Sequence, residues 1–115
     1  PSLENKLIAH AIRVPVSNVS ALNVTVELAG EVTAEAVNNR LESAAQGALT
    51  GILGFSREKL ASCDFIGDTR SAIVDSLQTG VVGNKTVNLL IWFDNEWAFA
   101  NRMLDIALMM TKHSD

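Results

Sequence analysis

The sequence predicts an α+β fold: a mainly antiparallel or mixed sheet, covered by one surface helix and followed by a helix that must be buried between two bodies. Residues 19–28 alternate apolar and polar side chains as a half-buried strand does, and residues 32–47 repeat apolar side chains at helical spacing. Residues 87–93 form an apolar run that leads into a second helical pattern. Together these stretches describe a sheet with helices packed against it.

The length and composition are those of one small domain or of part of a larger one. The chain has 115 residues, which is enough for a core of its own. Hydrophobic residues make up 48%, a high fraction for so short a chain, so we expect part of the apolar surface to face a partner or a further domain. The sequence begins with Pro1-Ser-Leu rather than Met, which indicates an excised or processed segment.

The charge pattern argues against nucleic-acid and membrane partners. The formal net charge is −4, and the sequence has no Lys/Arg cluster that could displace counterions from a phosphate backbone. No apolar run approaches the length of a membrane span, and no basic and apolar leader opens the chain. We therefore expect neither kind of partner.

Few residues qualify as metal ligands or nucleophiles. The single cysteine, Cys63, excludes an intramolecular disulfide and a multi-cysteine metal site, which favours a reducing, cytoplasmic setting. Cys63 lies in a strand-like run without a histidine or helix N-terminus to activate it, so we expect a buried, inert thiol. His10 and His113 have no second ligand at a suitable spacing, so we expect structural or exposed roles and no metal site.

The N-terminal part is expected to contribute two strands. Residues 6–14 are apolar on both faces and end at Pro15, which cannot donate to a strand ladder. Residues 19–28 follow after a turn and have one apolar and one polar face.

Residues 32–47 predict a surface helix. Thr33 is a natural N-cap, Val32 and Val37 have the spacing of a hydrophobic staple, and Gly47 is a natural C-terminal stop. The apolar side consists of Val37, Leu41, Ala44 and Ala45. The side expected to face water carries Asn38, Asn39, Glu42 and Gln46.

The middle of the chain is expected to consist of short extended segments. These are residues 51–54 (extended or a turn), 60–65, 71–75, 78–82 and 85–93, with a turn at 67–69. The last two segments form a hairpin, and Gly83 as the first residue of a two-residue loop with Asn84 suits a type II′ turn.

The junction between the last strand and the last helix is a candidate functional turn. Asp94 or Asn95 can cap the helix over residues 96–112 through a side-chain oxygen, and Glu96 suits the positive end of the helix dipole. Capping alone accounts for an acid and an amide before a helix. Such a turn can also aim one polar side chain at a ligand, and the residues themselves leave both interpretations open.

The final helix has apolar residues on two sides. One side carries Trp97, Ala100, Leu104 and Leu108, and the other carries Phe99, Met103, Ile106 and Met110. A core of this size cannot cover both sides, so we expect one of them to dock on a domain that this chain lacks.

Arg13 is the other candidate site residue. It ends an apolar run, where a guanidinium needs an anionic partner. That partner is either an internal carboxylate such as Asp64 or Asp75, or a ligand phosphate held by the guanidinium fork. The residues alone leave both alternatives open.

Four motifs resemble the C-terminal part of phosphorylating glyceraldehyde-3-phosphate dehydrogenases in order and spacing, over essentially the whole chain. They are Arg13-Val-Pro-x-x-Asn-Val-Ser, Gly51-Ile-Leu-Gly54, Ser62-Cys-Asp-Phe65, and Trp92-Phe-Asp-Asn-Glu-Trp97 followed by Asn101-Arg102. Further strings look more like the erythrose-4-phosphate dehydrogenase branch of this superfamily; they lie at residues 44–48, 71–75, 78–79 and 99–104.

The resemblance implies a role for each candidate residue. Arg13 matches the arginine that holds a substrate phosphate, and Asn95 matches the asparagine whose amide fixes the nicotinamide carboxamide of NAD. Phe99 stands where the glycolytic enzymes often carry a tyrosine, so a polar role there lacks its hydroxyl. Cys63 matches a non-catalytic position.

The resemblance also implies that the chemistry is completed outside this chain. The family's nucleophilic cysteine, histidine base and Gly-rich NAD-binding domain all precede residue 1, so residues 1–115 are expected to be the C-terminal portion of the catalytic domain, without a catalytic residue and inactive alone. The implied reaction is NAD-dependent oxidation of D-erythrose 4-phosphate to 4-phosphoerythronate through a cysteine thioester, in pyridoxal phosphate biosynthesis, by a cytoplasmic homotetramer. The alternatives are glycolytic oxidation of glyceraldehyde 3-phosphate, and a non-catalytic α+β binding module.

Overall fold

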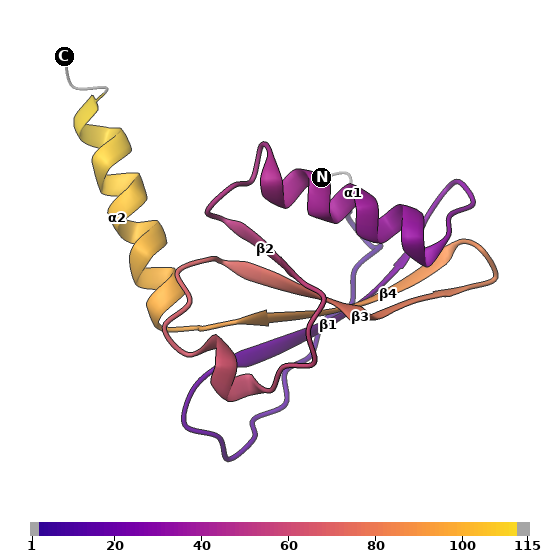
Figure 1. Cartoon of the computed structure of the whole chain (residues 1–115), viewed down its shortest axis with the longest axis horizontal. Helices are drawn as coiled ribbons and strands as arrows, with labels where there is room; N and C mark the ends of the chain where they lie inside the picture. The colour runs from indigo at the N-terminus through magenta and orange to yellow at the C-terminus, as the bar shows by residue number, and fades with distance from the viewer. Residues whose placement is uncertain (1–2, 113–115) are drawn as a thin grey trace.

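The computed structural model describes residues 3–112 and contains one mixed sheet, two α-helices and a short 3₁₀-helix (Figure 1). The elements in chain order are β1 (Ser20–Glu27), α1 (Ala34–Gln46), β2 (Leu53–Ser56), the 3₁₀-helix η1 (Ser62–Phe65), β3 (Ala72–Val82), β4 (Thr86–Phe93) and α2 (Trp97–Lys112). The strand order is β1-β4-β3-β2, with β2 parallel to β3 and the other two pairs antiparallel. The predicted α+β class is confirmed.

The core lies where both faces of the sheet are covered. Ile73 and Val74 are each 1% exposed although consecutive strand residues point to opposite faces. One face packs against η1, whose Phe65 stacks on Trp92 with ring centroids 5.5 Å apart and joins Ile73 in the core. Helix α1 contacts β2 and β3 and lies on the other side of the sheet (Figure 1).

Helix α1 begins as predicted, but one side chain expected to face water contacts the sheet instead. Thr33 caps it, because its Oγ1 accepts from the backbone N–H of Ala36 at 3.1 Å. Asn38, expected to face water, instead binds β3: its Nδ2 donates to the carbonyl of Ser76 at 3.2 Å, and its Oδ1 accepts from Thr79 Oγ1 at 2.7 Å. A polar side chain at that position joins the helix to the strand.

The hairpin between β3 and β4 is correctly predicted, but its turn type is not. Gly83 and Asn84 both have φ of +59°. A type II′ turn needs a positive φ at its first central residue alone, so this is a type I′ turn. The segments expected at 71–75 and 78–82 are one strand, β3, with an irregularity in its register between Asp75 and Gly80.

Two predicted strands are wrong. Residues 6–14 form no strand and pair with no strand of the described residues; Ile8 is 96% exposed. A strand needs a neighbour for its backbone groups, and periodicity cannot show that one is present. Residues 60–65 contain η1 instead, because Asp64 Oδ2 accepts from the backbone N–H of Ala61 at 2.7 Å and closes a tight turn. Cys63 on this turn is exposed, so the expected buried thiol is also wrong.

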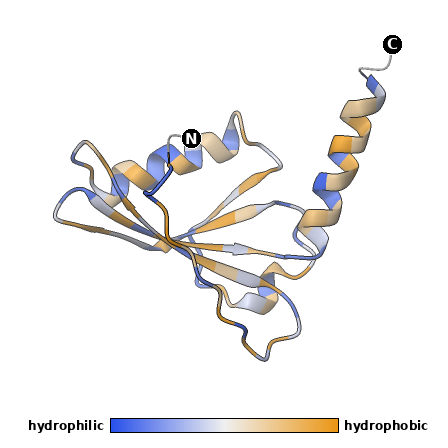
Figure 2. Ribbon diagram, turned by 180° about the vertical axis from the view of Figure 1, so that it is seen from behind, coloured by the Kyte–Doolittle hydropathy of each residue, from blue (hydrophilic) through white to orange (hydrophobic). Residues whose placement is uncertain are grey.

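Helix α2 extends away from the sheet (Figure 1), and many of its residues are hydrophobic (Figure 2). Within the described part of this helix only Ala98 is buried. Residues of both predicted apolar sides are exposed, as Leu104 at 64% and Phe99 at 66% show. Residues of this chain therefore leave both apolar sides of the helix exposed. Within residues 3–112, no helix combines the length and apolar character needed to cross a membrane.

Candidate functional site

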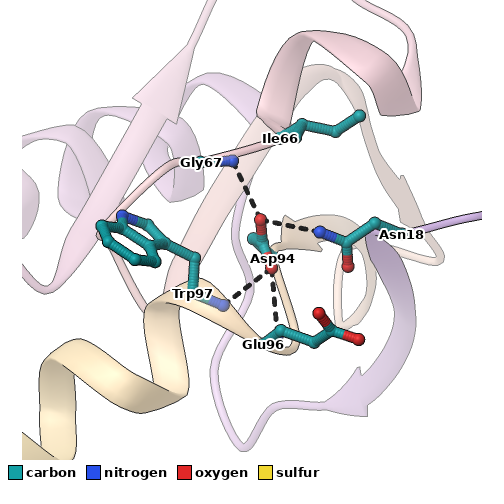
Figure 3. Close-up of a pocket in the computed structure, with 6 residues that line it drawn as sticks. All are labelled: Asn18, Ile66, Gly67, Asp94, Glu96 and Trp97. Carbon is teal, nitrogen blue, oxygen red and sulfur yellow. Dashed lines mark hydrogen bonds between the residues drawn. The ribbon is translucent and has the colours of Figure 1, made fainter.

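The candidate site is centred on Asp94, which lies between the end of β4 and the start of α2 (Figure 3). Its side chain is 1% exposed and accepts four hydrogen bonds. Oδ1 accepts from the backbone N–H groups of Glu96 at 3.0 Å and Trp97 at 2.9 Å, and Oδ2 accepts from the N–H of Gly67 at 2.9 Å and Asn18 Nδ2 at 3.0 Å. Asp94, rather than Asn95, is thus the cap of α2.

The charge of Asp94 is held by these donors and not by a cation. Burial alone acts to raise the pKa of its carboxyl group, but the N–H groups of Gly67, Trp97 and Glu96 and the amide of Asn18 outweigh burial and lower that pKa to about 2. The carboxylate is therefore ionised at neutral pH. It also lies at the positive end of the α2 dipole, which favours the anion.

Asn95 presents its amide beside this fixed turn. The residue is exposed, and its Oδ1 accepts from the hydroxyl of Ser20, the first residue of β1, at 3.2 Å. No hydrogen bond within residues 3–112 uses its Nδ2, so the amide N–H groups are available to a ligand. An exposed amide with its N–H groups available can donate hydrogen bonds to a ligand.

Arg13 lies in the exposed segment that precedes β1. Within residues 3–112, no ion pair joins Arg13 to the internal carboxylates considered as its partners. Asp64 accepts from Ala61 N–H, and Asp75 accepts from Trp92 Nε1 at 3.4 Å. The ion pairs of the described residues are Arg57–Glu42, Arg70–Asp68 and Arg102–Asp105. The guanidinium of Arg13 is thus open to an external anion, and no hydrogen bond among the described residues joins it to Asn95.

An open pocket of about 320 Å³ lies around Asp94 (Figure 3). It is lined by Asn18, Ile66, Gly67, Asp94, Glu96 and Trp97. Sequence reasoning found the acid-amide turn but missed the part played by Asn18 and Gly67, which come from two distant loops. The signals for them were a turn after Pro15 and a glycine turn, and neither signal says what the loop will contact.

Val19, next to Asn18, has a strained backbone. Its φ is +73°, in the left-handed region that β-branched residues rarely adopt. Its side chain is 6% exposed and belongs to the core with Phe65 and Ile73. Packing therefore holds the backbone in this conformation where Asn18 reaches Asp94. Nothing in the sequence pattern indicated this strain.

His10 is not among the residues that line the pocket. His10 is exposed, and His113 lies outside the described residues. Within residues 3–112, no group of three or more His, Cys, Asp or Glu side chains is placed to hold a metal ion.

Comparison with known proteins agrees with the motifs. The family model described as the glyceraldehyde 3-phosphate dehydrogenase C-terminal domain matches residues 1–95. A relative from Bacillus cereus, named glyceraldehyde-3-phosphate dehydrogenase 1, is 47% identical over 111 residues, which are 96% of this chain. The chain spans 33% of the length of that relative. This chain therefore belongs to the glyceraldehyde-3-phosphate dehydrogenase family and corresponds to its C-terminal domain.

Proposed function

We propose that the whole protein oxidises a phosphorylated sugar aldehyde with NAD through a cysteine thioester, and that glyceraldehyde 3-phosphate is the first candidate substrate. The observation that carries the proposal is the exposed amide of Asn95 beside the turn that Asp94 fixes. The choice of substrate is supported by the 47% identity to a protein that carries this aldehyde in its name.

Two residues of this chain have roles in the proposed reaction. Arg13 binds the substrate phosphate, since its guanidinium is exposed and has no ion pair within the described residues. Asn95 orients the nicotinamide by hydrogen bonds between its amide and the carboxamide of the cofactor, which accepts the hydride when bound. The thioester chemistry belongs to the part of the protein outside this chain.

Erythrose 4-phosphate is the second candidate substrate. It is favoured by the strings at residues 44–48, 71–75, 78–79 and 99–104, which resemble the erythrose-4-phosphate dehydrogenase branch. A role in pyridoxal phosphate biosynthesis belongs to this candidate alone. The strings are short, and none contains a residue whose chemistry selects one sugar.

Steady-state assays of the whole protein on both aldehydes, with and without inorganic phosphate, decide between the candidates. Glyceraldehyde 3-phosphate as the better substrate, with turnover that requires phosphate, supports the first. Erythrose 4-phosphate as the better substrate, with water in place of phosphate, supports the second. No NADH from either aldehyde would contradict both and favour a binding module.

We also propose that the whole protein is a cytoplasmic homotetramer. This chain has no intramolecular disulfide to form from its one cysteine, which suits a reducing compartment, and partner subunits would cover its exposed apolar surface. Sedimentation equilibrium of the whole protein tests the oligomeric state, and a monomer would contradict it.

A further inference from the structure

Asp94 connects three segments that meet at the pocket (Figure 3). Its oxygens accept from Gly67 in the loop after η1, from Asn18 in the loop before β1, and from the first turn of α2. A buried carboxylate with four donors is held in one orientation, because turning it would leave several N–H groups without acceptors.

The turn that carries Asn95 depends directly on these bonds. The residues on both sides of it are fixed, since Asp94 precedes it and the N–H groups of Glu96 and Trp97 donate to Asp94 Oδ1. The Asn95 side chain itself has one hydrogen bond to a described residue, from Ser20. Its direction therefore follows the position of Asp94.

The loop that carries Asn18 leads back to Arg13 through a short and restricted stretch. Pro15 has a fixed φ, and the N–H of Val16 donates to the carbonyl of Val14 at 2.9 Å. On the other side of Asn18, Val19 is fixed by its burial in the core. On the β1 side Asn18 is therefore held by the core, so a shift of Asn18 would have to be taken up on the side of Arg13.

We propose that Asp94 is a positioning residue that, through Asn18, holds the segment around Arg13 in a fixed relation to Asn95. This rests on the function proposed above and adds to it that phosphate capture and nicotinamide orientation are coupled. Losing the link between Asn18 and Asp94 should therefore affect substrate binding and hydride transfer together.

Two variants of the whole protein test the link, with glyceraldehyde 3-phosphate and NAD as probes. Asp94→Asn keeps the size of the side chain but replaces one acceptor by a donor. Asn18→Ala removes a single hydrogen bond to Asp94. The matched control is Asp64→Asn, because Asp64 also accepts from a backbone N–H, at 2.7 Å, but lies on η1 and does not line the pocket.

We expect Asp94→Asn to lower kcat by about ten- to a hundredfold and to raise the KM for the aldehyde. Asn18→Ala should change both in the same directions by up to about tenfold, and Asp64→Asn should change neither. Parental kcat and KM per folded molecule in Asn18→Ala would overturn the proposal. If Asp94→Asn fails to fold, the proposal is tested by Asn18→Ala alone and by the double-mutant cycle described next.

A double-mutant cycle with Asn95→Ala separates positioning from general stability. Asn18→Ala should no longer lower kcat when Asn95 is already replaced, although it should still raise the KM for the aldehyde. Equal loss of kcat in both backgrounds would overturn the positioning role while leaving the proposed function intact. Parental kcat in Asn95→Ala alone would overturn the cofactor role of Asn95 and this proposal with it.

Discussion

Asp94 shows how a buried charge can be stabilised by backbone donors instead of a counter-ion. Its folded pKa of about 2 is below the ordinary value of 3.8, so the unfolded chain binds the proton first as the pH falls. The contribution of Asp94 to stability is therefore complete above about pH 5 and is lost as the pH falls through 2.

The pH dependence of unfolding tests this at Asp94. We expect the urea midpoint of the whole protein to fall between about pH 5 and about pH 2.5, and the fall to be shallower in Asp94→Asn because asparagine does not titrate in this range. Equal slopes in parent and variant would contradict a lowered pKa of this carboxyl group.

The positive φ of Val19 predicts that replacement by glycine and by alanine will rank in an unusual order of stability. Val19→Ala and Val19→Gly both lose core packing, at a cost of about 2 kcal/mol or more. At a φ of +73°, glycine avoids a cost of about 1–2 kcal/mol that alanine still carries, so the glycine variant should be at least as stable as the alanine variant. Urea unfolding measures the order.

The same two substitutions at Val24, within β1, provide the control for Val19. There glycine should be less stable than alanine by about 0.5–1 kcal/mol, because the backbone has no left-handed strain. The same order at both positions would show that Val19 is not strained.

Arg13 is the residue at which the phosphate-binding role can be tested most directly. Arg13→Ala should lower kcat/KM for the aldehyde by about 1.5–3 kcal/mol of transition-state free energy, because a charged fork to the phosphate is lost. Arg40→Ala is the control, since Arg40 is also exposed but lies on α1. Unchanged kcat/KM in Arg13→Ala, or an equal loss in both variants, would contradict the assignment.

At the scale of elements, the sequence predicted those segments whose signals are local. The alternation of residues 19–28 predicted β1 to within one residue at each end, and the capping residue Thr33 placed the start of α1. The acid-amide turn predicted that Asp94 or Asn95 caps α2, and the structure selects Asp94. In each case neighbouring residues alone contain the information.

The failed predictions depend on partners that are distant in sequence. Residues 6–14 have the composition of a strand, but no strand of the described residues pairs with them. Residues 60–65 contain η1 because the Asp64 side chain accepts a hydrogen bond from the backbone N–H of Ala61. Asn18 and Gly67 become site residues only because the fold brings their loops to Asp94, 76 and 27 residues away along the chain. No periodicity within a single segment indicates such contacts.

Gly54 on β2 tests the packing of the parallel pair β2–β3. A Cβ atom there would lie 2.6 Å from Arg70 Nη1, so Gly54→Ala should displace the guanidinium from Asp68. The guanidinium lowers the Asp68 pKa, and its loss should let that pKa rise toward its ordinary value, at a cost of about 1 kcal/mol in unfolding free energy. Chemical denaturation and NMR titration of Asp68 measure both effects.

Gly80→Ala is the matched control for Gly54→Ala. Gly80 lies on β3 and does not have a positive φ, and a Cβ atom added to it would meet no heavy atom within 4 Å. The substitution should therefore be neutral in stability and leave the Asp68 titration unchanged. If Gly54→Ala is equally neutral in both measurements, the guanidinium of Arg70 stays on Asp68 and the predicted displacement is wrong.

For the whole molecule, the described chain exposes more apolar surface than a stable monomer normally does. Leu7, Ile8 and Ile12 near the N-terminus and the length of α2 are exposed, while the buried core is small. Large exposed apolar patches on a protein are typical of surfaces that another body covers. The chain spans 33% of the length of its relative, and under the proposed function a part of the protein outside this chain covers these patches.

The behaviour of the 115-residue chain on its own tests this surface. Phe99 and Met103 are 66% and 57% exposed on α2, and apolar exposure of this kind drives association. We expect the isolated chain to sediment as dimers or larger species, and the double variant Phe99→Glu with Met103→Glu to shift it toward the monomer. Thr111→Glu, which adds charge to the same helix at an exposed polar position, should not. A parent chain that stays monomeric at high concentration would show that α2 needs no covering partner.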